Sequence, residues 1–308
     1  MNILNHKKDI NKKKIKWCIG CGNYSIIMQL GKVLEKLKIK KNKIILVSGI
    51  GCSSRLPYYI NTFGIHGIHG RAFSIATGIK LSNKKLNVWV ITGDGDCFSI
   101  GLNHLLHTIR KNININILIF NNEVYSLTKG QKSVTNFNKN KFFNTISLIL
   151  SAGSNFVARC LDFNINHLKK ILIKANKHIG TSCIEIYQNC PIFNKNYFKK
   201  KIINNNNYII LKNNKPLIWG KKGIILIKNK PKIVYLTKKN ISNLWIHNEN
   251  NIYKAYILSR FKIINKQLPI PLGIFFKKKI KKKIKKINKK KKNIKLFKIL
   301  SNKKYEIL

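Results

Sequence analysis

Two short stretches decide the fold of this chain: Gly93-Asp94-Gly95-Asp96, and the pair Asn121-Asn122, which begins 25 residues after Asp96. Each motif comes after an apolar run, Leu86 to Ile91 in the first case and Ile113 to Phe120 in the second. Residues 97–111, between them, have the spacing of an amphipathic helix. The order is strand, turn, helix, strand, turn, which predicts a parallel α/β sheet with ligand sites at the carboxyl ends of its strands.

The residue types in the two turns favour a diphosphate held through a metal ion. Glycine lets a backbone approach a diphosphate closely, and the free N–H groups of Gly95 and Asp96, at the start of a helix, attract phosphate. Asp94 offers a carboxylate oxygen, Asn122 an amide oxygen and Val124 a backbone carbonyl, which are ligands that suit Mg²⁺. The alternative is a pair of ordinary polar turns without a ligand.

Further periodic segments extend the α/β pattern on both sides of these turns. Helices are predicted over residues 24–40 and 71–82 and around Leu168 to Ala175, and strands over Ile44 to Val47 and Cys183 to Tyr187. After about residue 200 the pattern weakens. We therefore expect a ligand-binding domain over residues 1–200 and a smaller, lysine-rich C-terminal extension over 201–308. Its tract 277–298 is predicted to be either a solvated amphipathic helix or a flexible tail.

The net charge of +52 has two interpretations. A nucleic-acid partner is one. The other is a genome rich in A and T, because the 61 basic residues include only five arginines and accompany abundant Asn and Ile. Arginine binds phosphate with two parallel hydrogen bonds and is the residue that a nucleic-acid-binding protein would favour, so we expect no nucleic-acid partner.

The first 16 residues lack an apolar core typical of a signal peptide, and no apolar stretch is long enough to span a membrane. We expect a cytoplasmic protein.

The seven cysteines divide into two groups by their surroundings. Cys97, Cys160 and Cys183 fall within predicted helix or strand and are expected in the core. Cys18 and Cys21 form a C-x-x-C, whereas Cys52 and Cys190 stand alone in predicted turns. Four thiolates suit a [4Fe–4S] cluster or tetrahedral Zn²⁺. A thioredoxin-like C-x-x-C would explain neither Cys52 nor Cys190.

Several motifs resemble the β subunit of 2-oxoacid:ferredoxin oxidoreductases. They are Gly64-Ile65-His66-Gly67-Ile68-His69-Gly70-Arg71, the GDGD itself, Asn103 to His107, and Asn122 to Gln131. The match is dense over residues 17–135 and looser in the C-terminal part, where Lys215 to Lys221 and Pro271 to Phe275 look most like the 2-oxoglutarate branch. The resemblance implies a thiamine-diphosphate-binding fold with a mostly parallel sheet.

The resemblance also implies roles for individual residues. It implies Mg²⁺ on Asp94, Asn122 and Val124, and a [4Fe–4S] cluster on Cys18, Cys21, Cys52 and Cys190. It implies a wall of the thiamine diphosphate site made by Ile50, Gly51, Cys52, Ser53, His69, Gly95, Asp96, Ser126 and Leu127. Lys129 is a candidate partner for a substrate carboxylate, and His69 for proton transfer or phosphate binding. The family often has glycine where this chain has Ser126, and a positive φ there would strain a serine.

The implied activity is oxidative decarboxylation of a 2-oxoacid, with 2-oxoglutarate favoured, to an acyl-coenzyme A, with electrons passing through the cluster to ferredoxin. None of the five glutamates of the chain lies in a context typical of the pyrimidine half of a thiamine site. An α subunit is therefore expected to supply that half, and the chain alone should be inactive. Three alternatives remain: a pyruvate or broad-specificity enzyme, a nucleic-acid-binding protein on a degenerate fold, and a non-catalytic assembly subunit with Zn²⁺.

Overall fold

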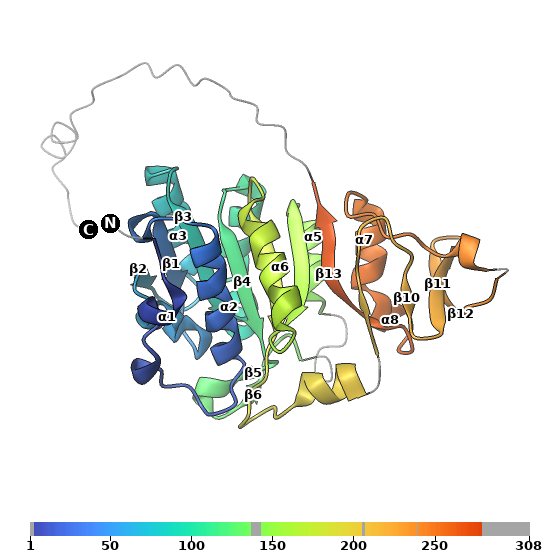
Figure 1. The fold of residues 1–308 in the computed structure, drawn as a ribbon, viewed down its shortest axis with the longest axis horizontal. Coiled ribbons are helices and arrows are strands. Elements are labelled where there is room, and N and C mark those ends of the chain that lie inside the picture. The colour runs from blue at the N-terminus through green and yellow to red at the C-terminus, as the bar shows by residue number, and fades with distance from the viewer. Residues whose placement is uncertain (1–2, 137–142, 205–206, 239, 279–308) are drawn as a thin grey trace, which may run out of the picture.

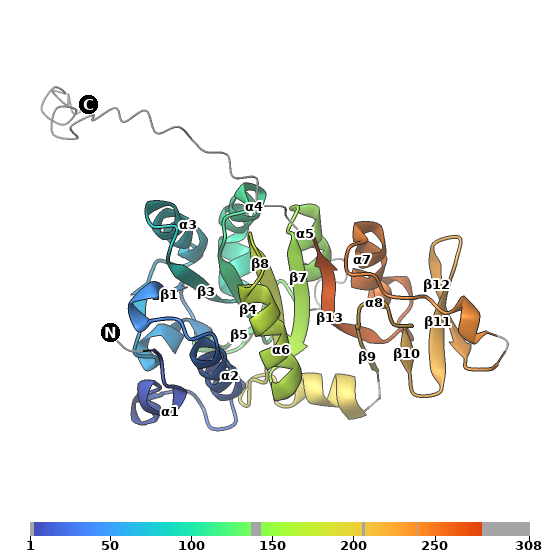
Figure 2. The same cartoon turned by 45° about the horizontal axis from the view of Figure 1, so that its top comes forward.

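The computed structural model describes residues 3–136, 143–204, 207–238 and 240–278 of the chain. These residues form a large mixed sheet with helices on both faces, and a smaller three-stranded sheet beyond one edge (Figures 1 and 2). Most of the predicted lysine tract lies outside the described residues.

The strands of the large sheet come from both halves of the chain. They are β1 (Ile44–Ser48), β2 (Phe63–His66), β3 (Asn87–Gly93), β4 (Asn116–Asn121), β7 (Phe156–Leu161), β8 (Ser182–Tyr187), β9 (Tyr208–Ile210) and β13 (Ile270–Lys277). Their order is β2-β1-β3-β4-β8-β7-β13-β9. All neighbours from β2 to β7 are parallel, and β13 is antiparallel to β7. The prediction of a mostly parallel α/β sheet is confirmed.

Helices cover both faces of this sheet. They are α1 (His6–Asp9), α2 (Asn23–Lys36), α3 (Ala72–Ser82), α4 (Leu102–Lys111), α5 (Thr145–Ser151), α6 (Ile165–Asn176), α7 (Ile252–Ser259) and α8 (Phe261–Ile264). Apolar side chains of α2 and α6 enter one core cluster, and those of α3, α4, α5 and α7 enter the other. The central strands are therefore buried on both faces, which explains their nearly continuous apolar sequences.

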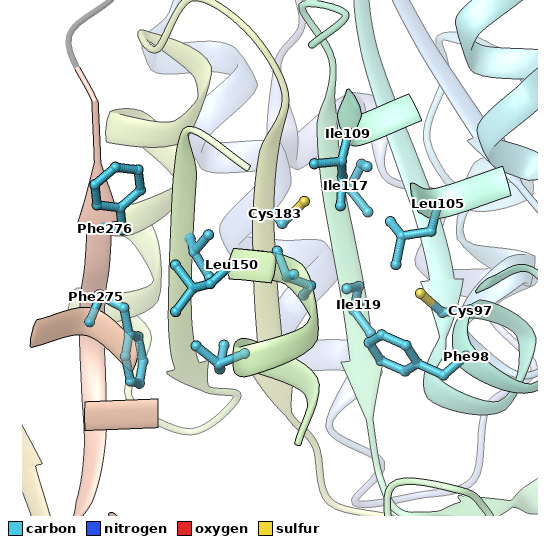
Figure 3. Close-up of a cluster of buried hydrophobic side chains, with 14 of the residues drawn as sticks. Cys97, Phe98, Leu105, Ile109, Ile117, Ile119, Leu150, Cys183, Phe275 and Phe276 are labelled. Atoms are coloured by element: carbon cyan, nitrogen blue, oxygen red, sulfur yellow. The ribbon is translucent and has the colours of Figure 1, made fainter. Parts of the chain in front are cut away.

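The second core cluster contains two of the cysteines that the sequence placed in the interior. Figure 3 shows Cys97 and Cys183 among Phe98, Leu105 and Ile117. Both thiols are fully buried, as is that of Cys160 in the opposite cluster. The prediction that these three cysteines are core residues is confirmed.

The helix predicted over 97–111 is interrupted. A π-helical turn, Asp96–Ile100, ends at Gly101, and α4 begins only at Leu102. A side chain at position 101 would lie 2.8 Å from the backbone oxygen of Asp96 and 3.0 Å from that of Gly70. The close approach of two backbones, which periodicity does not reveal, therefore breaks the helix here.

Strands after residue 200 were missed by the periodicity argument. β9 and β13 add to the large sheet, whereas β10 (Ile218–Trp219), β11 (Lys222–Ile227) and β12 (Lys230–Tyr235) form the small antiparallel one. β9 and β10 have only three and two residues, too few for a period to show, and in β12 two of the exposed positions carry Lys230 and Lys232. The sequence division at residue 200 stays a prediction.

Two glycines near α3 offer a matched test of backbone freedom. Gly70 has φ +72°, and a side chain there would lie 2.7 Å from the backbone nitrogen of Gly101. Gly70→Ala should therefore lower the free energy of unfolding by about 2 kcal/mol or more. Gly78, inside α3, has nothing within 4 Å of such an atom, so Gly78→Ala should raise it by roughly 0.5–1 kcal/mol. Urea unfolding of both variants checks the pair; equal effects would contradict it.

Candidate active site

The carboxyl ends of β1, β3, β4 and β8 meet at one edge of the sheet, where these four strands are consecutive neighbours. The turn after β1 carries Cys52, that after β3 carries Asp94, that after β4 carries Asn122, and that after β8 carries Cys190. Four motifs spread over 139 positions of the sequence therefore lie side by side in space.

A cavity of about 140 Å³ opens at this edge. All nine residues proposed to line a thiamine diphosphate site lie in its wall, together with the three proposed Mg²⁺ ligands. The wall also contains five residues that were not among the predicted site residues: Gly93, Phe120, Tyr125, Thr128 and Gln188.

Asp94 is held by two hydroxyl groups from a distant turn. The Ser133 hydroxyl donates to Asp94 Oδ2 at 2.5 Å and the Thr135 hydroxyl to the same oxygen at 2.6 Å. The carboxyl is almost fully buried, and burial raises its pKa to about 6 despite these hydrogen bonds. Sequence reasoning missed Ser133 and Thr135, which lie about 40 residues downstream in a segment without a recognisable motif.

Asn122 begins a tight turn in the cavity wall, and hydrogen bonds within this turn hold its side-chain amide. Its side-chain oxygen accepts from the backbone N–H of Val124 at 3.1 Å, and its amide nitrogen donates to the Ser126 hydroxyl at 3.0 Å. Glu123, between them, has φ +61°, which the tight turn requires. The Asn194 side chain donates to the backbone oxygen of Asn122 at 2.8 Å and so ties this turn to the loop that carries Cys190.

Asp96 lies in the cavity wall, but its carboxylate bonds to two neighbouring loops and to strand β3. Oδ1 accepts from the backbone N–H of Gly70 at 2.6 Å and of Ile50 at 3.2 Å, and contacts His69 Nδ1 at 2.5 Å. Oδ2 accepts from the Thr92 hydroxyl at 2.7 Å. The arrangement gives Asp96 and His69 a structural task, which is to hold the loops that form the cavity.

Two features of the wall suit an anionic ligand. The Ser53 hydroxyl is buried and has no hydrogen-bond partner among the described residues, so a ligand oxygen would satisfy it. Gly51 has φ +126° and open space where a side chain would project, so a ligand can approach its backbone closely. These observations fit a diphosphate.

Four cysteines lie together beside the cavity and are called the cysteine quartet: Cys18, Cys21, Cys52 and Cys190. Cys21 is electrostatically coupled to Cys52 and Cys190, and Cys52 to Cys18 and Cys190. Burial raises the pKa of Cys21 to about 12 and also raises that of Cys52. In the ranges that the structure describes, no three His, Cys, Asp or Glu side chains are close enough to hold a single metal ion.

Two polar side chains of the cavity wall contact sulfurs of the cysteine quartet. The Gln188 amide donates to Cys21 Sγ at 3.2 Å, and Ser126 Oγ lies 3.4 Å from Cys190 Sγ. Ser126 is not among the residues of positive φ, so the strain considered for a serine at this position does not arise.

Lys129 occupies a different environment from the other proposed site residues. It is exposed, has φ +68° at the end of the turn Ser126–Thr128, and is not part of the cavity wall. Its assignment to a substrate carboxylate stays a prediction.

Glu123 and Glu185 face a second, larger cavity of about 520 Å³. Glu185 is fully buried and forms an ion pair with Arg159 at 2.6 Å, while burial raises the pKa of Glu123 to about 7. Neither lines the smaller cavity. Sequence reasoning did not find this second cavity, because its walls come from many separate segments of the chain.

Comparisons with known proteins show the fold and the family of this chain. Residues 49–186 match the family described as "Thiamine pyrophosphate enzyme, C-terminal TPP binding domain". The subunit KorB of a 2-oxoglutarate oxidoreductase from Mycobacterium tuberculosis is 44% identical over 224 residues, which are 68% of this chain and 60% of that protein. The β subunit of a 2-oxoacid:ferredoxin oxidoreductase from Saccharolobus solfataricus is 40% identical over 203 residues, 60% of this chain and 67% of its own length.

A solved structure extends the likeness to the C-terminal part. A chain of the 2-oxoglutarate:ferredoxin oxidoreductase from Magnetococcus marinus, determined with 2-oxoglutarate, coenzyme A and succinyl-CoA bound, superposes with a TM-score of 0.70 at 26% identity. The match covers 91% of this chain and 87% of that one. The expected thiamine-diphosphate-binding fold is thereby confirmed, and so is the resemblance noted in the sequence. The chain belongs to the family of β subunits of 2-oxoacid:ferredoxin oxidoreductases.

Proposed function

We propose that this chain is the β subunit of a thiamine-diphosphate-dependent oxidoreductase that converts a 2-oxoacid, preferentially 2-oxoglutarate, and coenzyme A to an acyl-coenzyme A. The observation that carries the proposal is the contiguity of two sites: the cavity with Asp94 and Asn122 in its wall directly adjoins the cysteine quartet. A cofactor that releases electrons and a centre that accepts them would need this closeness. The 2-oxoglutarate preference rests on two of the relatives described above.

Asp94, Asn122 and Val124 would hold Mg²⁺, and the ion would bind the diphosphate. Asp94 supplies the negative charge, while Asn122 and Val124 supply neutral oxygens. Ser53 would donate to a phosphate oxygen, and the bare backbone at Gly51 would permit close approach. When bound, thiamine diphosphate supplies the decarboxylation chemistry. The residues described here fix its position, and Leu127, which is exposed at the mouth, would shield the site when a partner subunit covers it.

The cysteine quartet would ligate a [4Fe–4S] cluster. The convergence of four cysteines from three separate segments of the chain, two of them hydrogen-bonded to residues of the cavity wall, supports the cluster. Its electrons would pass to ferredoxin, whose association the positive charge of the chain would assist.

The remaining parts of the active site would come from an α subunit. The cavity wall of this chain contains no glutamate, whereas thiamine chemistry needs one at the pyrimidine ring. We therefore propose that the α subunit supplies that glutamate and most of the substrate pocket. We also propose that Lys129 reaches the substrate carboxylate only in that complex. None of the described helices is both long and apolar enough to cross a membrane, and we propose the cytoplasm as the location.

Anaerobic co-purification with the α subunit tests this function. The complex should contain iron and sulfide in equal amounts, little zinc, and turn over 2-oxoglutarate with coenzyme A and ferredoxin, whereas the chain alone should be inactive. Faster turnover of pyruvate would establish the alternative specificity, which the broader 2-oxoacid relatives leave open. Zinc without iron, or tight salt-dependent binding of nucleic acid without turnover, would refute the proposal.

The raised pKa of Asp94 gives the metal site a defined pH dependence. Mg²⁺ binds the ionised carboxylate, so below the pKa of about 6 its affinity should fall by about tenfold for each pH unit. Mg²⁺ titrations at pH 5, 6 and 7.5, at saturating thiamine diphosphate, check this slope. An affinity that is constant over this range would contradict it.

The stability of the metal-free chain should change in the opposite direction. The folded pKa of Asp94, about 6, lies above the ordinary value of 3.8 for this group, so the folded state holds the proton more tightly than the unfolded state. The corresponding stabilisation is complete below pH 4 and is lost as the pH rises through 6. Asp162 and Glu123 have pKa values raised in the same direction. The contribution of Asp94 is isolated by comparing the free energies of unfolding of wild type and Asp94→Asn in urea. Relative to that of Asp94→Asn, the value for wild type should be lower at pH 7 than at pH 4.5.

A further inference from the structure

We infer that Ser126 is a positioning residue that links the metal site to the cluster site through its hydroxyl group. The inference rests on the proposed function. Ser126 Oγ lies 3.0 Å from the amide nitrogen of Asn122 and 3.4 Å from Cys190 Sγ. The Ser126 hydroxyl therefore contacts Asn122, a proposed Mg²⁺ ligand, on one side and Cys190, a proposed cluster ligand, on the other.

The chemistry of the groups fixes the direction of both hydrogen bonds. An amide nitrogen can only donate, so Ser126 Oγ accepts from Asn122. The hydroxyl proton is then free to point elsewhere. A cysteine that ligates iron is a thiolate and can only accept. The order is thus Asn122 N–H to Ser126 oxygen, and Ser126 O–H to Cys190 sulfur.

The first hydrogen bond orients the amide of Asn122. Because the nitrogen points to Ser126, the oxygen faces the opposite way, where it accepts from the backbone N–H of Val124. A carbonyl-type oxygen has two lone pairs, and the second remains for the metal. Without the Ser126 hydroxyl the amide loses one of the two contacts that select this orientation, which should weaken metal binding.

The second hydrogen bond acts on the reduction potential. An electron added to the cluster increases the negative charge on its sulfur ligands, and a hydrogen bond to such a sulfur stabilises the reduced form. Gln188 donates to Cys21 from the same wall of the cavity. Ser126 and Gln188 therefore act alike on the cluster, but only Ser126 is also hydrogen-bonded to Asn122.

This difference provides a matched pair of variants, Ser126→Ala and Gln188→Leu. Ser126 does not have a positive φ, so alanine and threonine fit its backbone conformation. Ser126→Thr keeps the hydroxyl and should restore wild-type behaviour. Ser74→Ala removes an exposed hydroxyl on α3, whose partner is the backbone of Arg71, and serves as the control for losing a hydroxyl elsewhere.

The test uses the complex with the α subunit, purified without oxygen, and two measurements. An EPR-monitored redox titration should show that Ser126→Ala and Gln188→Leu each lower the ratio of reduced to oxidised cluster at least threefold at a fixed potential, a shift of about 28 mV at 59 mV per tenfold. A Mg²⁺ titration at saturating thiamine diphosphate, followed by circular dichroism, should show a loss of affinity of about tenfold for Ser126→Ala relative to Gln188→Leu.

The outcomes separate the two proposals. If wild type has a cluster and turnover, but Ser126→Ala changes neither the potential nor the Mg²⁺ affinity, the inference is wrong and the function stands. A change in only one of them also overturns the link, as does a failure of Ser126→Thr to restore either value. If wild type contains no cluster, both the proposed function and this inference fall.

Discussion

Asp94→Asn should eliminate Mg²⁺ and thiamine diphosphate binding and reduce turnover by the complex with the α subunit about 1000-fold or more. Asp94 is the one carboxylate among the proposed metal ligands, and Asn122 and Val124 contribute only neutral oxygens. A metal that anchors a diphosphate contributes several kcal/mol, which corresponds to a rate change of this size. The amide still accepts a hydrogen bond, so the contacts with Ser133 and Thr135 can persist.

The same substitution should not unfold the chain. The ionised carboxylate of Asp94 is disfavoured in the folded metal-free protein because it is buried, so its removal relieves that cost above pH 6. Glu249→Gln is the matched control, because it makes the same chemical change on a C-terminal loop. Mg²⁺ titration, cofactor retention and turnover should be normal in Glu249→Gln. Normal cofactor binding in Asp94→Asn would show that the metal site is wrongly assigned.

Cys190→Ser should yield a complex that lacks the iron–sulfur cluster and does not reduce ferredoxin. A serine oxygen is a harder and poorer ligand for iron than a thiolate, and Cys190 is buried beside Cys21 and Cys52, where no other thiol can replace it among the described residues. Iron and sulfide should fall to background, and turnover with ferredoxin should fall by about 1000-fold or more because the electrons have no acceptor.

Cys160→Ala is the matched control for this loss. Cys160 is fully buried in β7 within the apolar core, so its truncation should cost about 1 kcal/mol of stability and leave iron content unchanged. Thiamine diphosphate should still bind to Cys190→Ser, although more weakly, because Cys190 contacts Ser126 and not the proposed Mg²⁺ ligands themselves. A Cys190→Ser complex with full iron content and electron transfer would remove Cys190 from the ligand set.

The parts of the fold that could be predicted are those with a regular pattern. Nearly continuous apolar runs marked β1, β3, β4 and β8, because strands covered on both faces have no polar side. The break at Gly101 and the strands after residue 200 were missed. The first depends on a close approach of backbones from distant segments. Several of the missed strands are too short for a period to show, and β12 has lysines at two of its exposed positions.

The proposed site divides in the same way. Asp94 and Asn122 were proposed from residue type and strand–turn spacing, and the cysteine quartet mainly from the family resemblance; the structure brings these residues to one edge of the sheet, and their roles stay predictions. Ser133 and Thr135, which hold Asp94, and the loop-bonding task of Asp96 were not found. A hydroxyl that bonds to a carboxylate 40 residues away has no local signature.

The sequence by itself determined which groups are available: a carboxylate and an amide after two buried strands, glycines where a backbone must lie bare, and four thiols in turns. The tertiary structure alone decided that these groups share one place. β1 and β8 are separated by β3 and β4, a spacing of about 14 Å across the sheet. Cys52 and Cys190 are therefore neighbours only because their loops bend over the ends of the two strands between them, and strand order is a property of the packed sheet that no local stretch of sequence encodes.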